Sequence, residues 1–338
     1  KMSCRPAASP KEWGNRYRGR PGPPVRKRTL KSAKTRVRDW LEWCDERDIE
    51  NLNELTGRDL ADFVAWRRGD IAPITLQKQL STIRMALRWW ADIEAVEEGL
   101  AERLHAPELP DGAESRDRHL EPERAKQVLE YYDRHHYASR EHALLALMWR
   151  TGLRRGAVWS LDVDDLKPEE NAVRLEHRPE QGTKLKNGER GERWVYLGPR
   201  WFQILEDWVK NPDRPQGTDE YGREPLFPTQ RGDRPNPQTI YKWVIRALHP
   251  CEYAECPHGR TPESCDARGR TANVSACPSS VNPHAIRRGA ITHHLTEDVP
   301  PETVSERMDV SLDVLYDHYD ARTQREKMSV RTEHLPDS

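Results

Sequence analysis

The stretch NPHAIRRGAITHHL, residues 282–295, combines the start of a helix with a group of cationic side chains. Asn282 is a favoured N-cap and Pro283 is a favoured first helical residue. His284 and Arg287 then lie three residues apart on one face of the first turns, beside free N–H groups and the positive end of the helix dipole. These features suit a phosphate. Taken alone, the motif is also compatible with a surface helix that carries incidental charges.

An arginine pair upstream could serve the same anion. In TGLRRGAVWSL, residues 151–161, Gly152 is suited to end a helix, so Arg154 can project from a fixed turn. A guanidinium fork holds two phosphate oxygens at once, which a lysine cannot reproduce. The adjacent Arg155 could instead be the solvated member of the pair.

A third cation lies in a predicted β-hairpin. The runs AVRLEHR and ERWVYL, residues 172–178 and 192–197, have β-type composition, and Asn-Gly at 187–188 marks a turn between them. Lys184 is placed at the mouth of this hairpin. A lysine there is usually solvated, and Lys186 competes for any role.

The chain of 338 residues is long enough for two domains. Apolar residues recur at helical spacing through most of it, including a predicted capping box at Thr56 and Asp59. The predicted fold is mainly α with one small antiparallel β-sheet. We predict a basic flexible arm at residues 1–28, a helical domain at 29–104, a linker at 105–118, a second domain at 119–331 with a cysteine-rich insertion at 249–281, and a tail at 332–338.

Charge distribution is more informative than net charge. The formal net charge is −1, which predicts no polyanionic partner, but the first 38 residues are rich in lysine and arginine and poor in acids. Such a segment is typical of a nucleic-acid-binding arm or of a solvated tail. The sequence contains no apolar run of membrane-spanning length and no signal-peptide core, so we expect a cytoplasmic, nucleoid-associated protein without a membrane partner.

Four of the six cysteines fall in the insertion: Cys251, Cys256, Cys265 and Cys277, with His258 close by. Cytosolic cysteines gathered in one Gly/Pro-rich loop predict a structural zinc ion with four ligands, and His258 is an alternative ligand. The spacing is not the familiar paired C-x-x-C. An irregular insertion with reduced, idle thiols is the competing interpretation.

In their order along the chain, these motifs resemble the catalytic constellation of the tyrosine recombinases, or phage-type integrases. The order is an arginine in TGLRRGAVWSLDVDDL, a lysine in a β-hairpin, HAIRRGAITHHL, and a downstream tyrosine. The resemblance spans roughly residues 29–331, and residues 29–104 resemble the family's core-binding domain. The fold that it implies is a helical core-binding domain followed by an α+β catalytic domain.

The resemblance also implies the chemistry. In SLDVLYDHYD, residues 311–320, it places the nucleophile at Tyr319 and leaves Tyr316 as a packing residue. Tyr319 would attack double-stranded DNA to form a 3′-phosphotyrosyl bond, with a tetramer on two DNA sites exchanging strands. No metal or other cofactor takes part in this reaction, and accessory DNA-bending proteins are candidate partners.

The remaining roles follow from the same resemblance. Arg154 and Arg287 would clamp the phosphate, Lys184 would protonate the leaving 5′ oxygen, and His284 would assist proton transfer or hold the phosphate. One position departs from the family, because Val310 stands where a histidine or tryptophan is usual and cannot donate a hydrogen bond. His294 or His318 could substitute for it.

Two other functions remain open from the sequence. A non-catalytic DNA-binding relative is slightly favoured by Val310 and disfavoured by the otherwise intact set of site residues. A type IB topoisomerase-like enzyme is less compatible with the separate helical N-terminal domain.

Overall fold

The computed structural model describes residues 27–108, 119–261, 263–268, 273–320, 322–325 and 327–328, with side chains from residue 35 onward. The chain divides into two compact units, Lys1–Asp117 and Arg118–Ser338. The tail predicted at 332–338 lies outside the described residues, as do most of the arm predicted at 1–28 and most of the linker predicted at 105–118.

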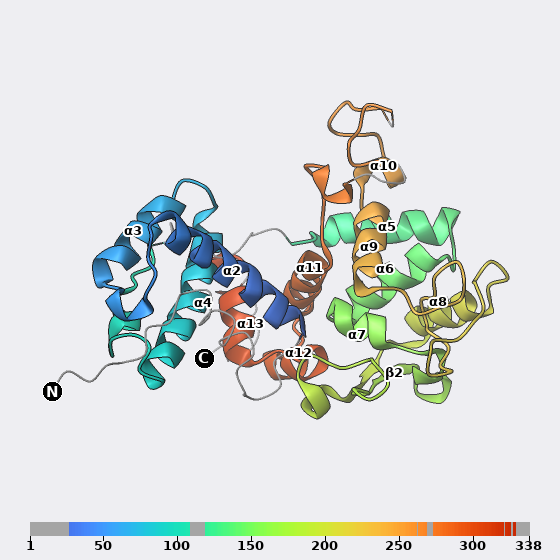
Figure 1. Ribbon diagram of the computed structural model, residues 1–338. Helices are drawn as coiled ribbons and strands as arrows, with labels where there is room; N and C mark the ends of the chain where they lie inside the picture. The colour runs from blue at the N-terminus through green and yellow to red at the C-terminus, as the bar shows by residue number, and fades with distance from the viewer. Residues whose placement is uncertain are drawn as a thin grey trace, which may run out of the picture. The chain divides into compact units, whose positions relative to one another are not determined.

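The first unit is helical (Figure 1). Its core contains an aromatic cluster in which the Phe63 ring lies 4.8 Å from Trp40 and 5.5 Å from Trp43, in edge-on geometry that aromatic rings favour. The capping box predicted at Thr56 and Asp59 is present and starts the second α-helix. The elements are α2 (Lys27–Glu46), η1 (Leu52–Glu54), α3 (Gly57–Arg67), α4 (Pro73–Asp92) and η2 (Leu100–Arg103).

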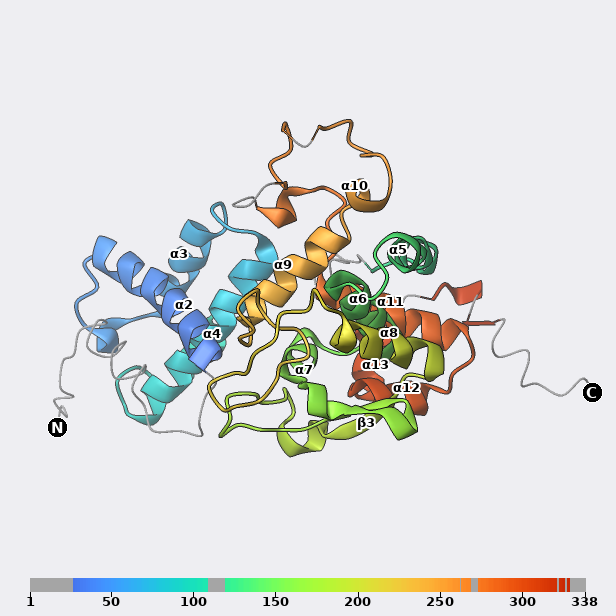
Figure 2. The same cartoon turned by 90° about the vertical axis from the view of Figure 1, so that its right-hand side faces the viewer.

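The second unit is built around one buried helix, α6 (Arg140–Thr151), which contacts α5, α8, α9 and α11 (Figures 1 and 2). The run HALLALMW in α6 is buried along its whole length, because neighbouring helices cover it on several sides. The other helices are α5 (Pro122–His135), α7 (Arg155–Ser160), α8 (Pro199–Lys210), α9 (Pro237–Ala247), α10 (Pro250–Tyr253), α11 (Pro283–Thr296), α12 (Pro301–Met308) and α13 (Leu312–His318).

A three-stranded antiparallel sheet completes this unit: β1 (Leu166–Lys167), β2 (Ala172–Leu175) and β3 (Arg193–Tyr196), in that order. Val173 pairs with Val195, and both side chains are buried in the core. The predicted fold class, mainly α with a small antiparallel sheet, is therefore confirmed. The two-residue strand β1 was not predicted, because so short a strand carries no readable alternation.

The connection between β2 and β3 differs from the predicted simple hairpin. An isolated bridge pairs Arg178 with Thr183 and closes a first turn soon after β2. A 3-10 helix, η5 (Gly188–Gly191), then follows Asn187 where a single Asn-Gly turn was predicted. The segment that carries Lys184 and Lys186 therefore runs from the Arg178–Thr183 bridge to η5, and is not the tip of a single hairpin loop.

Two glycines mark close approaches around α11. Gly152 ends α6 in the left-handed region, at φ 58°, and a Cβ there would lie 2.5 Å from the Met308 sulfur. A Cβ at Gly289 would clash with the carbonyl oxygen of Leu120. The end of α6 therefore packs closely against the Met308 side chain at the end of α12, and α11 packs closely against the backbone at Leu120, just before α5.

Across the described residues, every helix is too short or too polar to cross a membrane.

Candidate active site

The start of α11 is organised as the sequence predicts. The Asn282 side chain accepts hydrogen bonds from the backbone N–H groups of His284 and Ala285, at 2.9 and 3.0 Å. This cap fixes the first turn, so His284 remains on the surface while Arg287, three residues later, is directed inward and is 1% exposed.

Arg287 is held by backbone carbonyls rather than by a carboxylate. One terminal nitrogen donates to the carbonyl oxygens of Gly152 at 2.8 Å and Met308 at 2.6 Å. Burial, with the nearby Arg154 cation, lowers the pKa of Arg287 to about 10. The guanidinium therefore stays charged at neutral pH, and its charge is left for another anion.

Arg154 lies at the N-cap of α7 and forms an ion pair with Asp309. The second carboxylate oxygen of Asp309 accepts a hydrogen bond from the Asn187 side chain at 2.7 Å. Asp309 occupies the left-handed turn between α12 and α13, at φ 53°, a conformation that aspartate tolerates better than most residues. An oxyanion thus already sits against Arg154.

Tyr319 follows α13 and is buried, with 6% of its surface exposed. Its ring centroid lies 5.2 Å from the Arg287 guanidinium carbon and 5.3 Å from the His284 ring. Tyr316, one turn earlier, is 48% exposed. Of the two tyrosines considered from the sequence, the structure therefore brings Tyr319 to His284 and Arg287.

Burial and the positive charge of the site both affect the protonation of His284. Partial burial of the ring, and then the positive charges of Arg287, Arg288, Arg154 and Lys186, lower the pKa of His284 below 6.5. The residue as a whole keeps an exposed surface, so solvent can reach it. His284 is neutral at pH 7 and can accept a proton.

Two lysines approach this region on one segment. Thr183 and Leu185 are buried, and Lys184 and Lys186 alternate with them on the exposed side. Lys186, together with Arg154, Asn187 and Asp309 among others, lines a cavity of about 590 Å³. The structure thus places Lys186 in the cavity beside Arg154, and Lys184 two residues earlier on the exposed side of the same segment.

The arrangement matches a known family. The family model of the phage integrases matches residues 118–323, more than half of the chain. The chain belongs to the phage integrase family. The resemblance to tyrosine recombinases is thereby confirmed.

Curated relatives of this chain are tyrosine recombinases. Tyrosine recombinase XerC of Pseudomonas aeruginosa is 25% identical over 286 residues, which cover 83% of this chain and 80% of that protein. Tyrosine recombinase XerC 2 of Ralstonia nicotianae is 26% identical over 233 residues, or 65% of this chain and 62% of that protein's length.

Solved structures show the integrase fold at low identity. The Tn1549 transposon integrase, in complex with a circular intermediate DNA, has a TM-score of 0.69 at 13% identity and covers 98% of this chain and 100% of that one. A lambda integrase tetramer bound to a Holliday junction has a TM-score of 0.65 at 13% identity, covering 94% and 79%. At this identity the likeness concerns the fold alone.

Val310 is a core residue in this chain. It is 6% exposed and packs with Leu315 and Tyr319 in an apolar cluster. The two histidines considered as substitutes are placed elsewhere: His294 is bonded through Nδ1 to the Ala290 carbonyl of its own helix at 2.7 Å, and His318 is exposed.

The sequence did not predict that Asp309 pairs with Arg154, or that Asn187 binds Asp309. Asp309 stands in a segment whose sequence predicts only a turn, and its contact with Arg154 spans 155 positions. Asn187 was assigned to a turn but also binds Asp309. No local pattern reports such pairings, because they depend on how α12 meets the β2–β3 connection.

The cysteine-rich insertion contains thiols with defined polar neighbours. The sulfur of Cys251 accepts a hydrogen bond from Arg268 at 3.0 Å. Cys256 accepts hydrogen bonds from the backbone N–H groups of Arg260 and His258, which lower the pKa of its thiol. Hydrogen bonds of this kind stabilise a thiolate, the form that binds metals.

The predicted zinc ligands do not form a coordination group. Cys277 is buried, and burial raises the pKa of its thiol, with a further increase from the charges of Cys251, Cys265 and Cys256. Within the described parts of the insertion, as in the other described residues, no three or more His, Cys, Asp or Glu side chains are arranged to hold a metal ion. The four sulfurs are near enough to interact electrostatically without converging on one point.

Proposed function

We propose that this chain is a site-specific DNA recombinase that cleaves and rejoins DNA through a covalent bond between Tyr319 and a 3′ phosphate. The observation that carries the proposal is the position of the Tyr319 ring, 5.2 Å from the Arg287 guanidinium carbon and 5.3 Å from the ring of a neutral His284. A nucleophile, a proton acceptor and a fixed cation are the elements that metal-free phosphoryl transfer needs.

The arginines stabilise the charge that develops on the phosphate. Arg287 has donors satisfied only by neutral carbonyls, and Arg154 holds a carboxylate that a phosphodiester can displace. An oxyanion bound by Arg154 in the free protein supports a phosphate site at the same guanidinium. Both cations are placed before the reaction starts, so little reorganisation accompanies the transition state.

Proton transfer completes the step. Tyr319 loses its proton to His284 as its oxygen bonds to phosphorus, the bond from phosphorus to the 5′ oxygen breaks, and that oxygen takes a proton from a lysine. Lys184 is the lysine predicted from the sequence, and Lys186 is the competitor that lines the cavity with Arg154. The new phosphotyrosyl bond keeps the energy of the phosphodiester, so rejoining is the same step in reverse.

Double-stranded DNA is the proposed substrate and a tetramer on two DNA sites the proposed assembly. The similar lambda integrase has been solved as a tetramer bound to a Holliday junction, and the Tn1549 integrase in complex with DNA. A fold shared with both supports the same kind of partner here. Accessory DNA-bending proteins remain an expectation.

Covalent trapping tests the reaction. The full chain is incubated with nicked DNA that carries a site selected for binding from a random library, and denaturing gels detect a protein–DNA adduct. We expect an adduct with the natural chain and with Tyr316→Phe, and none with Tyr319→Phe. Tight binding with no adduct from any variant would favour the alternative, a non-catalytic DNA-binding relative in which Val310 marks the loss of activity.

We also propose that Cys251, Cys256, Cys265 and Cys277 hold a structural zinc ion, with His258 as the alternative ligand. The described side chains form no coordination group, so the proposal rests on the donor set: four thiols on one insertion, close enough to influence one another. Elemental analysis of the purified chain tests it. About one zinc per chain is expected, and Cys256→Ser should reduce this content; a metal-free natural chain would leave the thiols idle.

A further inference from the structure

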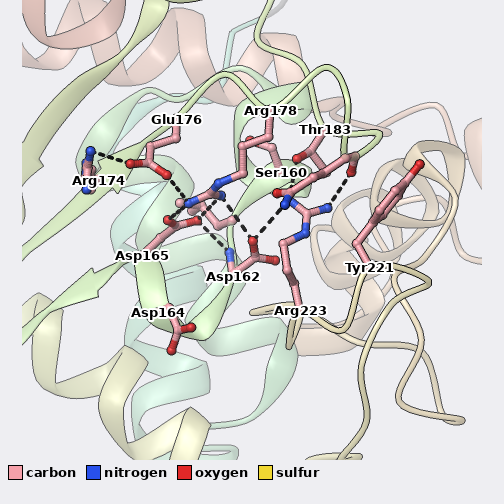
Figure 3. A network of polar contacts seen from close by, with 12 residues as sticks. Ser160, Asp162, Asp164, Asp165, Arg174, Glu176, Arg178, Thr183, Tyr221 and Arg223 are labelled. Atoms are coloured by element: carbon pink, nitrogen blue, oxygen red, sulfur yellow. Dashed lines mark hydrogen bonds and ion pairs between the residues drawn. The ribbon is translucent and has the colours of Figure 1, made fainter.

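A buried ionic network contacts the segment that carries Lys184 and Lys186, at Thr183 (Figure 3). Its centre is formed by Asp162 and Asp165, which are 3% and 2% exposed. Arg178 donates to Asp162 at 3.1 Å and to Asp165 at 3.0 Å. Buried carboxylates are tolerated only when cations and donors satisfy them, so this network has one well-defined arrangement.

Arg223 connects the network to the segment that carries the lysines. One terminal nitrogen donates to the Thr183 hydroxyl at 2.8 Å and lies 3.5 Å from an Asp162 oxygen. The other donates to the Gln181 carbonyl at 2.7 Å and to Asp219 at 2.8 Å. A single planar guanidinium thus binds both the segment and two carboxylates. Figure 3 shows Arg223 between Thr183 and Asp162.

Backbone contacts hold the residues on either side of Lys184. The carbonyl oxygen of Thr183 accepts from the Arg178 N–H at 2.8 Å, and the Leu185 N–H donates to His177 Nδ1 at 3.0 Å. Thr183 and Leu185 are buried, whereas Lys184 between them is exposed. The chain is therefore fixed at both neighbours of a lysine whose side chain can reach outward.

The same network is tied to the helix that Arg154 starts. Asp162 follows α7 by two residues, and Arg234 joins Asp162 to the Trp159 carbonyl within α7. One rigid assembly therefore supports both a phosphate-binding arginine and the lysine segment. A displacement of about 1 Å between such groups can reduce a reaction rate about 10²-fold.

We propose that Arg223 is a positioning residue that sets the place of the lysine segment, residues 183–186, relative to the leaving 5′ oxygen. The inference rests on the proposed function, in which a lysine of this segment protonates that oxygen. Arg223 itself does not touch DNA in this role; it acts through Thr183. Its loss should therefore affect departure of the 5′ oxygen more than attack by Tyr319.

The test compares two substrates with the full-length chain. One is nicked DNA carrying the selected site, and the other is identical except that sulfur replaces the leaving 5′ oxygen. A thiolate leaves without a proton because thiols are far stronger acids than alcohols. We expect Arg223→Lys to cleave the oxygen substrate about 10²-fold more slowly than the natural chain, and the sulfur substrate within about threefold of it.

Arg234→Lys is the matched control. Arg234 binds the same two carboxylates, Asp162 and Asp219, but it also donates to the carbonyls of Trp159 and Leu161, which lie outside the lysine segment. Any loss from this change should be equal for both substrates. Thr183→Val removes the acceptor of Arg223 without leaving a buried charge, and should repeat the selective loss if Arg223→Lys folds poorly.

The outcomes separate the two proposals. A natural chain that binds the site but cleaves neither substrate overturns the proposed function. A natural chain that cleaves both, with Arg223→Lys and Thr183→Val equally slow on both, overturns only the positioning role and makes the network merely structural. Selective rescue by sulfur in these variants, and not in Arg234→Lys, supports the inference.

Discussion

Two groups of arginines in the second unit meet opposite surroundings. Arg178 and Arg223 bind buried carboxylates, and the hydrogen bond to Asp165 raises the pKa of Arg178. Arg287 instead binds neutral carbonyls, and burial lowers its pKa to about 10. The charges of Arg178 and Arg223 are neutralised within the protein, whereas Arg287 keeps its positive charge for a ligand. Arginine count therefore says little about DNA binding; the balance of nearby carboxylates says more.

The largest expected effect follows from removing a site cation. Arg154→Ala should slow formation of the Tyr319 adduct about 10³-fold, because one charge-stabilising donor is commonly worth 10²- to 10³-fold or more. Folding should change little, since the Arg154–Asp309 pair is only partly buried. Adduct formation over time and the melting temperature are the two measurements. A large fall in melting temperature with normal cleavage would show that Arg154, like Arg178 and Arg223, has a structural role.

Removing an arginine from the buried ionic network should instead lower the stability of the fold. Arg178→Ala leaves Asp162 and Asp165 without their main shared partner, and breaking a buried pair in this way costs about 3–5 kcal/mol of folding free energy. Urea unfolding measures the loss. Arg174→Ala is the control, because the partly exposed pair of this β2 residue with Glu176, just after the strand, should contribute at most about 1 kcal/mol. Similar losses of folding free energy for Arg178→Ala and Arg174→Ala would show that the buried network contributes no more to stability than an exposed ion pair.

The features that sequence could predict are those determined by neighbouring residues. Asn282 caps α11, Gly152 ends α6 and Thr56 caps α3, because each signal depends on side chains within a few positions of the backbone that it satisfies. Tyr319 could be favoured over Tyr316 only through the order of motifs in a family. Both tyrosines have similar local sequence.

The features that sequence could not predict are long-range pairings. Nothing near Asp309 indicates that it meets Arg154, and nothing near Arg223 indicates that it supports Thr183 across 40 positions. The choice between Lys184 and Lys186 also stays open in the sequence, because alternation places both on one side of an extended segment. Distinguishing them requires the path of the chain between β2 and β3.

A smaller effect is expected from changing Asp309, the carboxylate that pairs with Arg154. Asp309→Asn removes the negative charge that competes with phosphate for Arg154 and keeps the size and hydrogen-bonding shape of the side chain. In a Tyr319→Phe background, we expect about threefold to tenfold tighter DNA binding, by fluorescence anisotropy at fixed salt, because each additional unpaired cation strengthens phosphate binding. Weaker binding would show instead that Asp309 orients Arg154.

The smallest effect concerns pH. Partial burial of the His284 ring, together with the cations around it, lowers its pKa below 6.5, so the neutral, proton-accepting form prevails at pH 7. The rate of adduct formation should therefore be level from pH 8 to about 6.5 and should fall at lower pH as His284 gains a proton. His284→Gln should lose this dependence as well as much of the rate.

The same titration can distinguish the two groups of arginines. Arg154→Lys keeps a positive charge near His284 and should leave the pH at which the rate falls almost unchanged, whereas Arg154→Ala removes one of the charges that lower the pKa and should move that pH upward. Arg178→Ala, in the network, should leave it where it is. If Arg178→Ala shifted the profile as much as Arg154→Ala, the charge of the network would not be neutralised internally, and the contrast between the two groups would fail.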